Sequence, residues 1–537
     1  MNAPYQLLIH SGLVVDGSGN PGFQAAVGVR GDRVYVLRGD VSDVPADRRI
    51  DARGLVVAPG FIDAHSHSDL VLMVDRTLEM KVRQGVTTEI LGVDGLSYAP
   101  FDDPADLVRF VRLNAGIAGH PDLDYSWRSV ADLLDRYDGN ASVNVGVFVG
   151  NTAPRISALG WSAARADAVA LDRMRGIVRD AMRDGALGLS TGLDYPPGSH
   201  ADTDELVELA KEAARFGGIY HTHVRYALGD TYLDPFKEAL EIGRRAGLPV
   251  QLTHFSRSSR ATYVGGAQRM LDLVDDARSD GLDVTFDTYP YEWGGTRLVR
   301  LLPGWLQADG PDLLQERLSD PALRDRLRAE LHDSAAVRQY AASRPFVDVR
   351  LGNLSDPAHL RFEGWNLAEV VTELGGDLTG TLCDLSAANP GATFTRPSPQ
   401  AMTLWKFVCH PLGMIASDAV LIGAYPSPRA YGCFARVLGD FVREERLLSL
   451  PEAIRKMTSF PAQRLGLSDR GLLRDGMKAD LVVFDPKTVN APASYERPRE
   501  LAQGVSYVAV NGRLVLDGGV LTGATPGRAL RGPGAVR

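Results

Sequence analysis

Cysteine is scarce in this sequence, with only three in 537 residues: Cys383, Cys409 and Cys433. They form no Cys-x-x-Cys pair, so neither a disulfide framework nor a thiolate zinc site is indicated. A metal ion bound to this chain must therefore be held by histidines and carboxylates.

Long apolar runs are also lacking. No stretch of about 18 apolar residues occurs, the length that spans a bilayer, and the first residues lack the basic and apolar segments of a leader peptide. The formal net charge of −9 is spread along the chain, which favours neither nucleic acid nor an anionic membrane as a partner. We expect a cytoplasmic protein with a small-molecule substrate. The sequence leaves open whether copies form a homo-oligomer.

The composition is that of an ordinary globular enzyme, with 45% hydrophobic and 23% charged residues. The length predicts two or more domains, or one large barrel with additions. Residues 5–58 have the pattern of short strands separated by turns, and residues 479–516 have the same texture. We therefore expect one small β domain built from both ends of the chain, residues 1–58 and 467–537.

The middle of the chain, residues 59–466, alternates apolar runs of strand length with helical segments, a pattern typical of βα units and a parallel sheet. Eight candidate strands predict an α/β fold with a closed barrel. These strands are Leu55–His67, Thr87–Gly92, Val143–Val149, Leu187–Thr191, Gly218–His223, Val250–His254, Asp283–Tyr289 and Leu412–Asp418. The segment before the last strand is too long for a plain loop. We expect an insertion at about 296–343, with helical character, over the active-site face.

Two histidines, His65 and His67, follow the first long apolar run. Alternate residues of an extended segment point to one face, so these two side chains would project together. A lone His-x-His pair is weak evidence for a metal site. Further polar residues, however, stand at the ends of other candidate strands: Asp94, His223, His254 and Asp418.

Any one of these side chains could be a buried residue satisfied by the backbone, but that explanation is poor for six at once. Barrel enzymes collect their functional groups from the ends of different strands. A set of histidines and carboxylates without thiolates suits Zn²⁺ or another borderline divalent ion. His221 lies two residues before His223, one layer deeper on the same strand face, and we interpret it as a packed or supporting histidine in preference to a ligand.

The chain resembles the amidohydrolase superfamily and, within it, the N-acyl-D-amino-acid deacylases, or D-aminoacylases. The resemblance extends almost from end to end. It rests on the segments Pro59-Gly-Phe-Ile-Asp-Ala-His-Ser-His, Gln84-Gly-Val-Thr-Thr, Gly188-Leu-Ser-Thr-Gly-Leu-Asp-Tyr-Pro-Pro-Gly, Thr222-His-Val-Arg, Asp287-Thr-Tyr-Pro-Tyr, Ser417-Asp418, Pro428-Arg-Ala-Tyr-Gly and Gly476-Met-Lys-Ala-Asp-Leu-Val-Val-Phe-Asp. It implies a (β/α)8 TIM-type barrel beside a small β-sandwich formed by both termini.

The resemblance also implies a ligand set for one or two Zn²⁺ ions. His223 and His254 match the histidines of the tightly held metal, and His65 and His67 match the pair at a second position. Asp418 matches the catalytic aspartate on the last strand, beside the metal.

Two positions depart from the family pattern. Asp94 stands where the best known D-aminoacylases have the ligand cysteine of Gly-Asn-Cys-Gly. A carboxylate can bind one metal or bridge two, so we expect a site of hard ligands. Ser256 stands where those enzymes have a lysine that helps an arginine to hold the substrate α-carboxylate. Arg429, Tyr195 and Tyr289 match that arginine and two pocket tyrosines.

The implied reaction is metal-dependent hydrolysis of the amide bond of an N-acyl-D-amino acid, with Asp418 moving the proton. A related hydrolase of a cyclic amide, a dipeptide or another N-substituted amino acid is the alternative, because one barrel site can attack many carbonyls. A non-catalytic barrel scaffold is a remote alternative. Lost metal ligands would be its signature, and all six strand-end groups are present.

Overall fold

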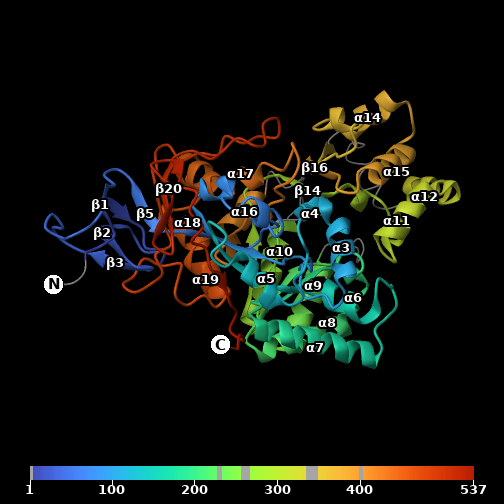
Figure 1. The fold of residues 1–537 in the computed structure, drawn as a ribbon, viewed down its shortest axis with the longest axis horizontal. Coiled ribbons are helices and arrows are strands. Elements are labelled where there is room, and N and C mark those ends of the chain that lie inside the picture. The colour runs from blue at the N-terminus through green and yellow to red at the C-terminus, as the bar shows by residue number, and fades with distance from the viewer. Residues whose placement is uncertain (1–3, 227–232, 256–265, 334–348, 398–402, 537) are drawn as a thin grey trace.

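The computed structural model describes residues 4–226, 233–255, 266–333, 349–397 and 403–536. Figure 1 shows a β sheet at one end of the molecule, a barrel ringed by helices in the middle, and a further lobe at the opposite end. The sheet combines blue strands from the first part of the chain with red strands from its last part.

The terminal sheet has the strand order β21-β20-β19-β18-β5-β1-β2-β3, with β4 beside β1. Its strands are β1 (Leu7–Val14), β2 (Phe23–Arg30), β3 (Arg33–Leu37), β4 (Arg49–Asp51), β5 (Val56–Pro59), β18 (Leu481–Phe484), β19 (Val505–Val510), β20 (Arg513–Asp517) and β21 (Val520–Leu521). The antiparallel pair of β5 and β18 joins the two ends of the chain. The β domain expected from both termini is therefore confirmed.

The barrel strands are parallel to their neighbours and buried. They are β6 (Phe61–Asp63), β7 (Val86–Leu91), β8 (Asn144–Val147) continued by β9 (Val149–Gly150), β10 (Gly188–Gly192), β11 (Ile219–His223), β12 (Val250–Leu252), β13 (Val284–Thr288) and β17 (Gly413–Ile415). A bridge between Ser66 and Ala419 closes the ring between β6 and β17. The expected (β/α)8 barrel is confirmed.

Helices cover the outside of the barrel: α3 (Pro104–Leu113), α5 (Val130–Tyr137), α6 (Thr152–Leu159), α7 (Ala168–Asp184), α8 (Thr203–Arg215), α9 (Asp234–Ala246), α10 (Gly266–Ser279), α16 (Leu404–Cys409), α17 (Arg429–Arg436) and α18 (Leu450–Met457). Helix α8 begins where the Asp202 side chain accepts a hydrogen bond from the Glu205 amide. Helix α9 ends at Gly247, whose φ of 72° continues the chain in a left-handed turn. None of the described helices combines the length and the apolar character that crossing a bilayer requires.

The first candidate strand, Leu55–His67, is not continuous. Its first part is β5 of the terminal sheet and its second part is β6 of the barrel, with the break at Gly60. A Cβ atom at this position would overlap the side chain of Thr87. Glycine therefore allows the backbone to pass closely over β7 as it changes sheets.

The last residues leave the terminal sheet and return to the barrel. Strand β22 (Ala529–Leu530) pairs in parallel with β8, at the end of the barrel where its strands begin. The β domain therefore does not extend to residue 537 as expected. The apolar alternation of its strands ends well before this tail, which is held by backbone hydrogen bonds such as Val145 N to Arg528 O (2.9 Å).

The insertion is larger than the expected residues 296–343, because it fills the whole connection from β13 to β17. It contains β14 (Trp293–Arg297), η3 (Leu298–Leu301), α11 (Pro311–Ser319), α12 (Pro321–Asp333), β15 (Arg350–Gly352), α14 (Leu367–Leu374), α15 (Leu378–Ala388) and β16 (Thr393–Pro397). Strands β14, β16 and β15 form an antiparallel sheet. Side chains such as Leu306, Leu351, Phe362, Leu382 and Phe394 make a hydrophobic core separate from that of the barrel. The insertion is thus a small lobe with its own interior.

Candidate metal centre

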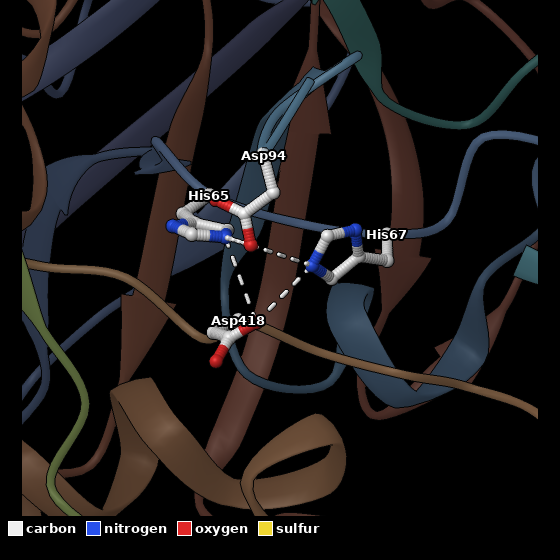
Figure 2. Close-up of side chains that lie close together, drawn as sticks. All are labelled: His65, His67, Asp94 and Asp418. Atoms are coloured by element: carbon white, nitrogen blue, oxygen red, sulfur yellow. Dashed lines mark hydrogen bonds and ion pairs between the residues drawn. The ribbon is translucent and has the colours of Figure 1, made fainter. Parts of the chain in front are cut away.

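Four of the candidate ligands surround one point at the mouth of the barrel (Figure 2). His67 Nε2 lies 3.2 Å from Asp418 Oδ1 and 3.6 Å from Asp94 Oδ2. His65 Nε2 lies 3.5 Å from each of the same two oxygens. We call this group, His65, His67, Asp94 and Asp418, the first metal position.

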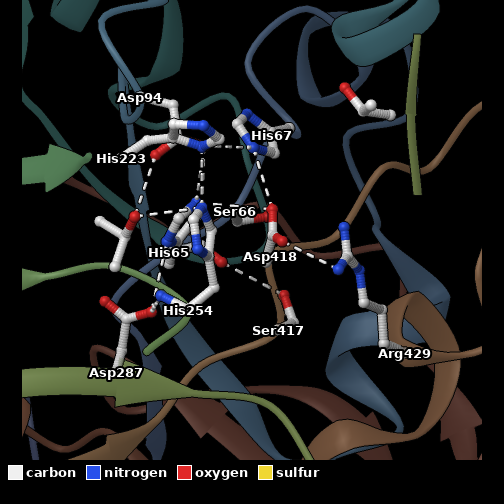
Figure 3. A network of polar contacts seen from close by, with 12 residues as sticks. His65, Ser66, His67, Asp94, His223, His254, Asp287, Ser417, Asp418 and Arg429 are labelled. Carbon is white, nitrogen blue, oxygen red and sulfur yellow. Dashed lines mark hydrogen bonds and ion pairs between the residues drawn. The ribbon is translucent and has the colours of Figure 1, made fainter. Parts of the chain in front are cut away.

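A second group shares Asp94 with the first. His223 Nδ1 and His254 Nε2 each lie 3.7 Å from Asp94 Oδ2, and 3.0 Å from one another. Figure 3 shows both groups in one network, with Asp94 beside His223 at its edge. We call Asp94, His223 and His254 the second metal position. One carboxylate oxygen is thus within reach of both positions.

The donor atoms fit divalent zinc in kind and in spacing. Two ligand atoms about 2.0–2.2 Å from a tetrahedral Zn²⁺ ion are about 3.4 Å apart, and the contacts above range from 3.0 to 3.7 Å. Both ring nitrogens of the fully buried His65 also lack a hydrogen-bond partner. Such orphaned polar atoms are rare in a protein interior. A bound cation would give His65 Nε2 the partner that it lacks.

The electrostatics of the site favour positive charge among its carboxylates. Burial alone would raise the pKa of Asp94, but the neighbouring histidines outweigh it and hold that pKa well below its usual value. Burial would lower the pKa of His223, whereas Asp194 and Asp94 raise it to about 9. The carboxylates dominate this site, so a positive charge between them is favoured.

The backbone is strained where it presents three of the ligands. Asp94, His254 and Asp418 have φ values of 54°, 34° and 46°, in the left-handed region that non-glycine residues rarely adopt. Strain of this kind is concentrated at functional sites, where the surrounding structure enforces it. Each of these residues follows the end of its strand, and the left-handed turn directs its side chain across the barrel mouth.

Two further carboxylates stand behind the histidines. Asp287 Oδ1 lies 3.4 Å from His65 Nδ1 and accepts a 2.7 Å hydrogen bond from the His254 amide. Asp194 Oδ2 lies 3.4 Å from His223 Nε2, and Arg300 of the insertion contacts the same oxygen at 2.8 Å. Carboxylates in this arrangement fix the orientation of a metal-binding histidine. Our sequence interpretation assigned them no role, although both lie in segments that carry the family resemblance.

The remaining histidine on β11 lies beneath the centre. His221 is stacked on Phe148, with ring centroids 4.7 Å apart, and its Nε2 is 3.8 Å from Asp287 Oδ2. Burial lowers the pKa of His221 to about 3, so the ring is neutral. This is the deeper layer in which the strand alternation placed it.

The predicted substrate-binding residues that the structure describes lie beside the two metal positions. Arg429, at the start of α17, is buried and contacts Asp418 Oδ2 through one guanidinium nitrogen at 2.8 Å (Figure 3). Its guanidinium carbon lies 4.5 Å from the centre of the Tyr289 ring. The Tyr195 ring packs 4.9 Å from that of His223, and its hydroxyl reaches Thr296 of the insertion at 3.3 Å. Ser256 lies outside the described residues.

Proteins of known family and structure match nearly the whole chain. The model of the Amidohydrolase family matches residues 48–333 and 410–516. A D-aminoacylase of Alcaligenes xylosoxydans xylosoxydans is 34% identical over 528 residues, 98% of this chain and 98% of its own.

Two solved structures are similar over 98% of this chain and their full length. One is a D-aminoacylase with a binuclear metal centre, described by one-metal activation and second-metal attenuation; it is 30% identical, with a TM-score of 0.81. The other is the N-acyl-D-glutamate deacylase of Bordetella bronchiseptica in complex with zinc and a phosphonate mimic of the tetrahedral intermediate, 29% identical with a TM-score of 0.82. By sequence and by fold, this chain belongs to the amidohydrolase family, among the N-acyl-D-amino-acid deacylases.

Proposed function

We propose that this protein is a zinc-dependent hydrolase that cleaves the amide bond of N-acyl-D-amino acids, releasing a carboxylate and a free D-amino acid. The observation that carries the proposal is the convergence of His65, His67, His223 and His254 on one oxygen of Asp94, with Asp418 beside them. The similar proteins support the substrate class, because they are a D-aminoacylase and an N-acyl-D-glutamate deacylase.

The residues divide the work as follows. His223, His254 and Asp94 hold the principal ion, and His65, His67 and Asp418 form the other position with the shared Asp94. When bound, a zinc ion would supply a Lewis acid for the scissile carbonyl and would lower the pKa of water toward about 7. Asp418 takes the proton from the attacking water as the new C–O bond forms. It then returns that proton to the nitrogen as the C–N bond breaks.

Arg429 holds the α-carboxylate of the substrate in this proposal. Its Nε is buried and has no hydrogen-bond partner, so the guanidinium has a donor left beyond its contact with Asp418. A planar guanidinium binds a carboxylate through two parallel hydrogen bonds. Tyr289 stacks against this arginine, and the Tyr195 ring packs beside His223. Ser256 completes the proposed set without the positive charge of a lysine.

The substrate class can be tested with zinc-loaded protein and matched pairs of N-acetyl and N-formyl D- and L-amino acids, with neutral and acidic side chains. We expect release of amine from the D-series only. Hydantoins and dipeptides in the same panel address the related hydrolases that act on other amides. Release from these alone, or from neither series, would overturn the proposal.

The number of ions is tested separately by adding zinc to metal-free protein and measuring bound metal and turnover together. The similar D-aminoacylase shows one-metal activation and second-metal attenuation. We expect the first equivalent of zinc to activate this enzyme as well. Asp418→Asn is the control, because it should retain the principal ion while turnover falls by about 10²- to 10⁴-fold.

The cellular setting is part of the proposal. The partner is a small molecule, and the three cysteines are all free, as is usual in a reducing cytoplasm. Light scattering of the purified protein would show whether copies assemble into a homo-oligomer.

A further inference from the structure

Strands β6 and β17 are joined by fewer backbone contacts than other neighbouring strands of the barrel. We call this junction the seam. Other neighbouring barrel strands share a ladder of paired residues, whereas among the described residues this pair has only the isolated bridge between Ser66 and Ala419. Two backbone hydrogen bonds support it, from Asp418 N to His65 O (2.8 Å) and from His67 N to Ala419 O (3.1 Å). His65 and His67 stand on one side of this seam and Asp418 on the other. The first metal position therefore depends on how the seam is held.

A fully buried lysine lies beneath the seam. Lys81, from helix α2 (Glu79–Val82), places its Nζ 2.6 Å from Asp63 Oδ2 and 2.8 Å from Glu89 Oε1. The same ammonium group donates to Ser66 Oγ at 3.2 Å and to Ser417 Oγ at 2.9 Å. Ser66 lies between the two histidines, and Ser417 directly precedes Asp418. One ammonium group therefore contacts both ligand-bearing loops.

Asp63 connects the same loops a second time. Its Oδ1 accepts a hydrogen bond from the Ser417 amide at 2.9 Å and lies 3.4 Å from the His65 amide, while its Oδ2 binds Lys81. Glu89, the other carboxylate on Lys81, accepts a hydrogen bond from Ser68, just beyond His67. Figure 3 shows Ser66 among the ligand side chains and Ser417 below Asp418.

Charge neutralisation alone does not explain this arrangement. Burying a lysine with two carboxylates incurs a desolvation penalty that a well-packed apolar cluster would avoid. The Lys81 ammonium group also donates hydrogen bonds to hydroxyl groups of two separate loops. An ion pair with the two carboxylates would not require these contacts. We propose that Lys81 is a positioning residue that sets the spacing between the His65–His67 loop and Asp418, and so forms the first metal position and directs Asp418.

The proposal predicts a selective defect. None of the described contacts of Lys81 reaches His223 or His254, which are instead supported by Asp194 and Asp287. Disturbing Lys81 should weaken the first metal position and leave the second intact. A residue needed only for folding would affect both positions and the stability together.

The main test variant is Ser417→Ala, which keeps the buried charges of Lys81, Asp63 and Glu89 but removes the hydroxyl group that contacts Lys81 and Asp63. The hydrogen bond from the Ser417 amide to Asp63 remains. Lys81→Met is the stronger variant. Ser142→Ala is the control, because Ser142 is also a buried serine with one hydrogen bond, to Thr77 O at 2.7 Å, remote from the site. Binding of two equivalents of Co²⁺ or Zn²⁺ is followed by equilibrium dialysis, with kcat and KM on the best amide substrate.

We expect Ser417→Ala to bind metal at the first metal position about 10- to 100-fold more weakly, the usual effect of losing support behind a ligand. This is the equivalent that binds second. Binding of the equivalent at the second metal position should be unchanged. kcat should fall with little change in KM. Unaltered binding of both equivalents in Ser417→Ala, or an equal loss of both, would overturn the proposal, and this holds even if Lys81→Met does not fold. The inference rests on the proposed metal ligands, but the dialysis result does not depend on which amide, if any, is hydrolysed.

Discussion

At the scale of single residues, the oxygen atoms of Asp94 decide the character of the metal centre. One of them faces four histidines at 3.5 to 3.7 Å. Asp94→Ala should therefore lose most bound zinc and most activity, because both metal positions lose a ligand. Metal analysis after gel filtration measures the loss. Asp94→Cys is the informative partner, since a thiolate should bind zinc more tightly than a carboxylate. An Asp94→Ala protein with its full metal content would show that Asp94 is no ligand.

Arg429 can be tested through the geometry of its donors. Lysine keeps the charge but cannot form two parallel hydrogen bonds, so Arg429→Lys should lower kcat/KM strongly for substrates with a free α-carboxylate. The loss should be much smaller for the corresponding amides or esters. Arg436→Lys is a matched control, because Arg436 stands on the same helix, 4.5 Å from the Tyr291 ring. Equal losses on charged and neutral substrates would contradict the proposed contact with the carboxylate.

Lys456 provides a test of pH dependence away from the metal centre. It lies buried on α18 and donates to Gly413 O at 2.7 Å. Burial lowers its pKa from 10.5 to about 8. Between these values the unfolded chain binds more protons than the folded one, so this group makes the free energy of unfolding rise with pH.

The size of the rise can be measured by urea unfolding at pH 7.5 and 9.5, below the range in which tyrosines ionise. Over this interval the free energy of unfolding of the wild-type protein should increase by about 1–2 kcal/mol relative to that of Lys456→Met. Lys456→Met has no such group and supplies the reference. If the free energy of unfolding changed with pH in the same way in both proteins, the pKa of Lys456 would not be lowered in the folded state.

At the scale of helices and strands, the sequence predicted best where one pattern acts locally. Helix α9, Asp234–Ala246, is followed by Gly247 in a left-handed turn, the position after a helix at which glycine is common. Histidines and aspartates after apolar runs were correctly expected at the ends of barrel strands. In contrast, the apolar run Leu55–Ile62 gave no sign that it is divided between two sheets, because both of its parts are buried.

The division at Gly60 makes a prediction about stability. Gly60→Ala should destabilise the protein by about 1–3 kcal/mol, since the added methyl group overlaps Thr87 in a packed interior. Gly176→Ala on helix α7 is the control, because its methyl group would meet no atom within 4 Å. That change should be neutral or stabilising, as alanine favours a helix. Thermal unfolding of both variants compares the two. Equal melting temperatures would remove the steric argument.

The supporting residues of the site were beyond prediction from the sequence. Asp194 and Asp287 stand in segments that carry the family resemblance, but their roles, like that of Lys81, follow from contacts between segments far apart in the chain. Lys81 and Ser417, for example, meet only once the barrel is closed. The lobe within the insertion was missed for a similar reason: its strands are short, and its core forms from residues spread between Leu298 and Phe394.

At the scale of the whole molecule, the C-terminal tail holds the start of the barrel strands together. Gly527 N bonds to Ala141 O at 2.8 Å, and Gly532 N bonds to Gly185 O at 2.8 Å. A chain that ends after residue 526 should unfold at a temperature several degrees lower, because these backbone groups and the edge of β8 lose their partners.

A chain that ends after residue 534 is the control for this truncation, since it keeps β22 and both bonds of the tail. Differential scanning calorimetry compares the two proteins with the full chain. Metal content at 20 °C should be unchanged in both, because the tail lies at the opposite end of the barrel from the metal centre. Identical melting curves for the two truncations would contradict a structural role for β22.

The pairing of β5 with β18 in the terminal sheet has a consequence for synthesis of the protein. Strand β5 pairs with β18, in a register that sets Pro59 opposite Leu481. At about 5–20 residues per second, a ribosome needs roughly 20–80 s to make the chain between them. Throughout that interval β5 has an open hydrogen-bonding edge, which invites pairing with other nascent chains. The yield of active protein should therefore depend on chaperones that protect the N-terminal strands during translation.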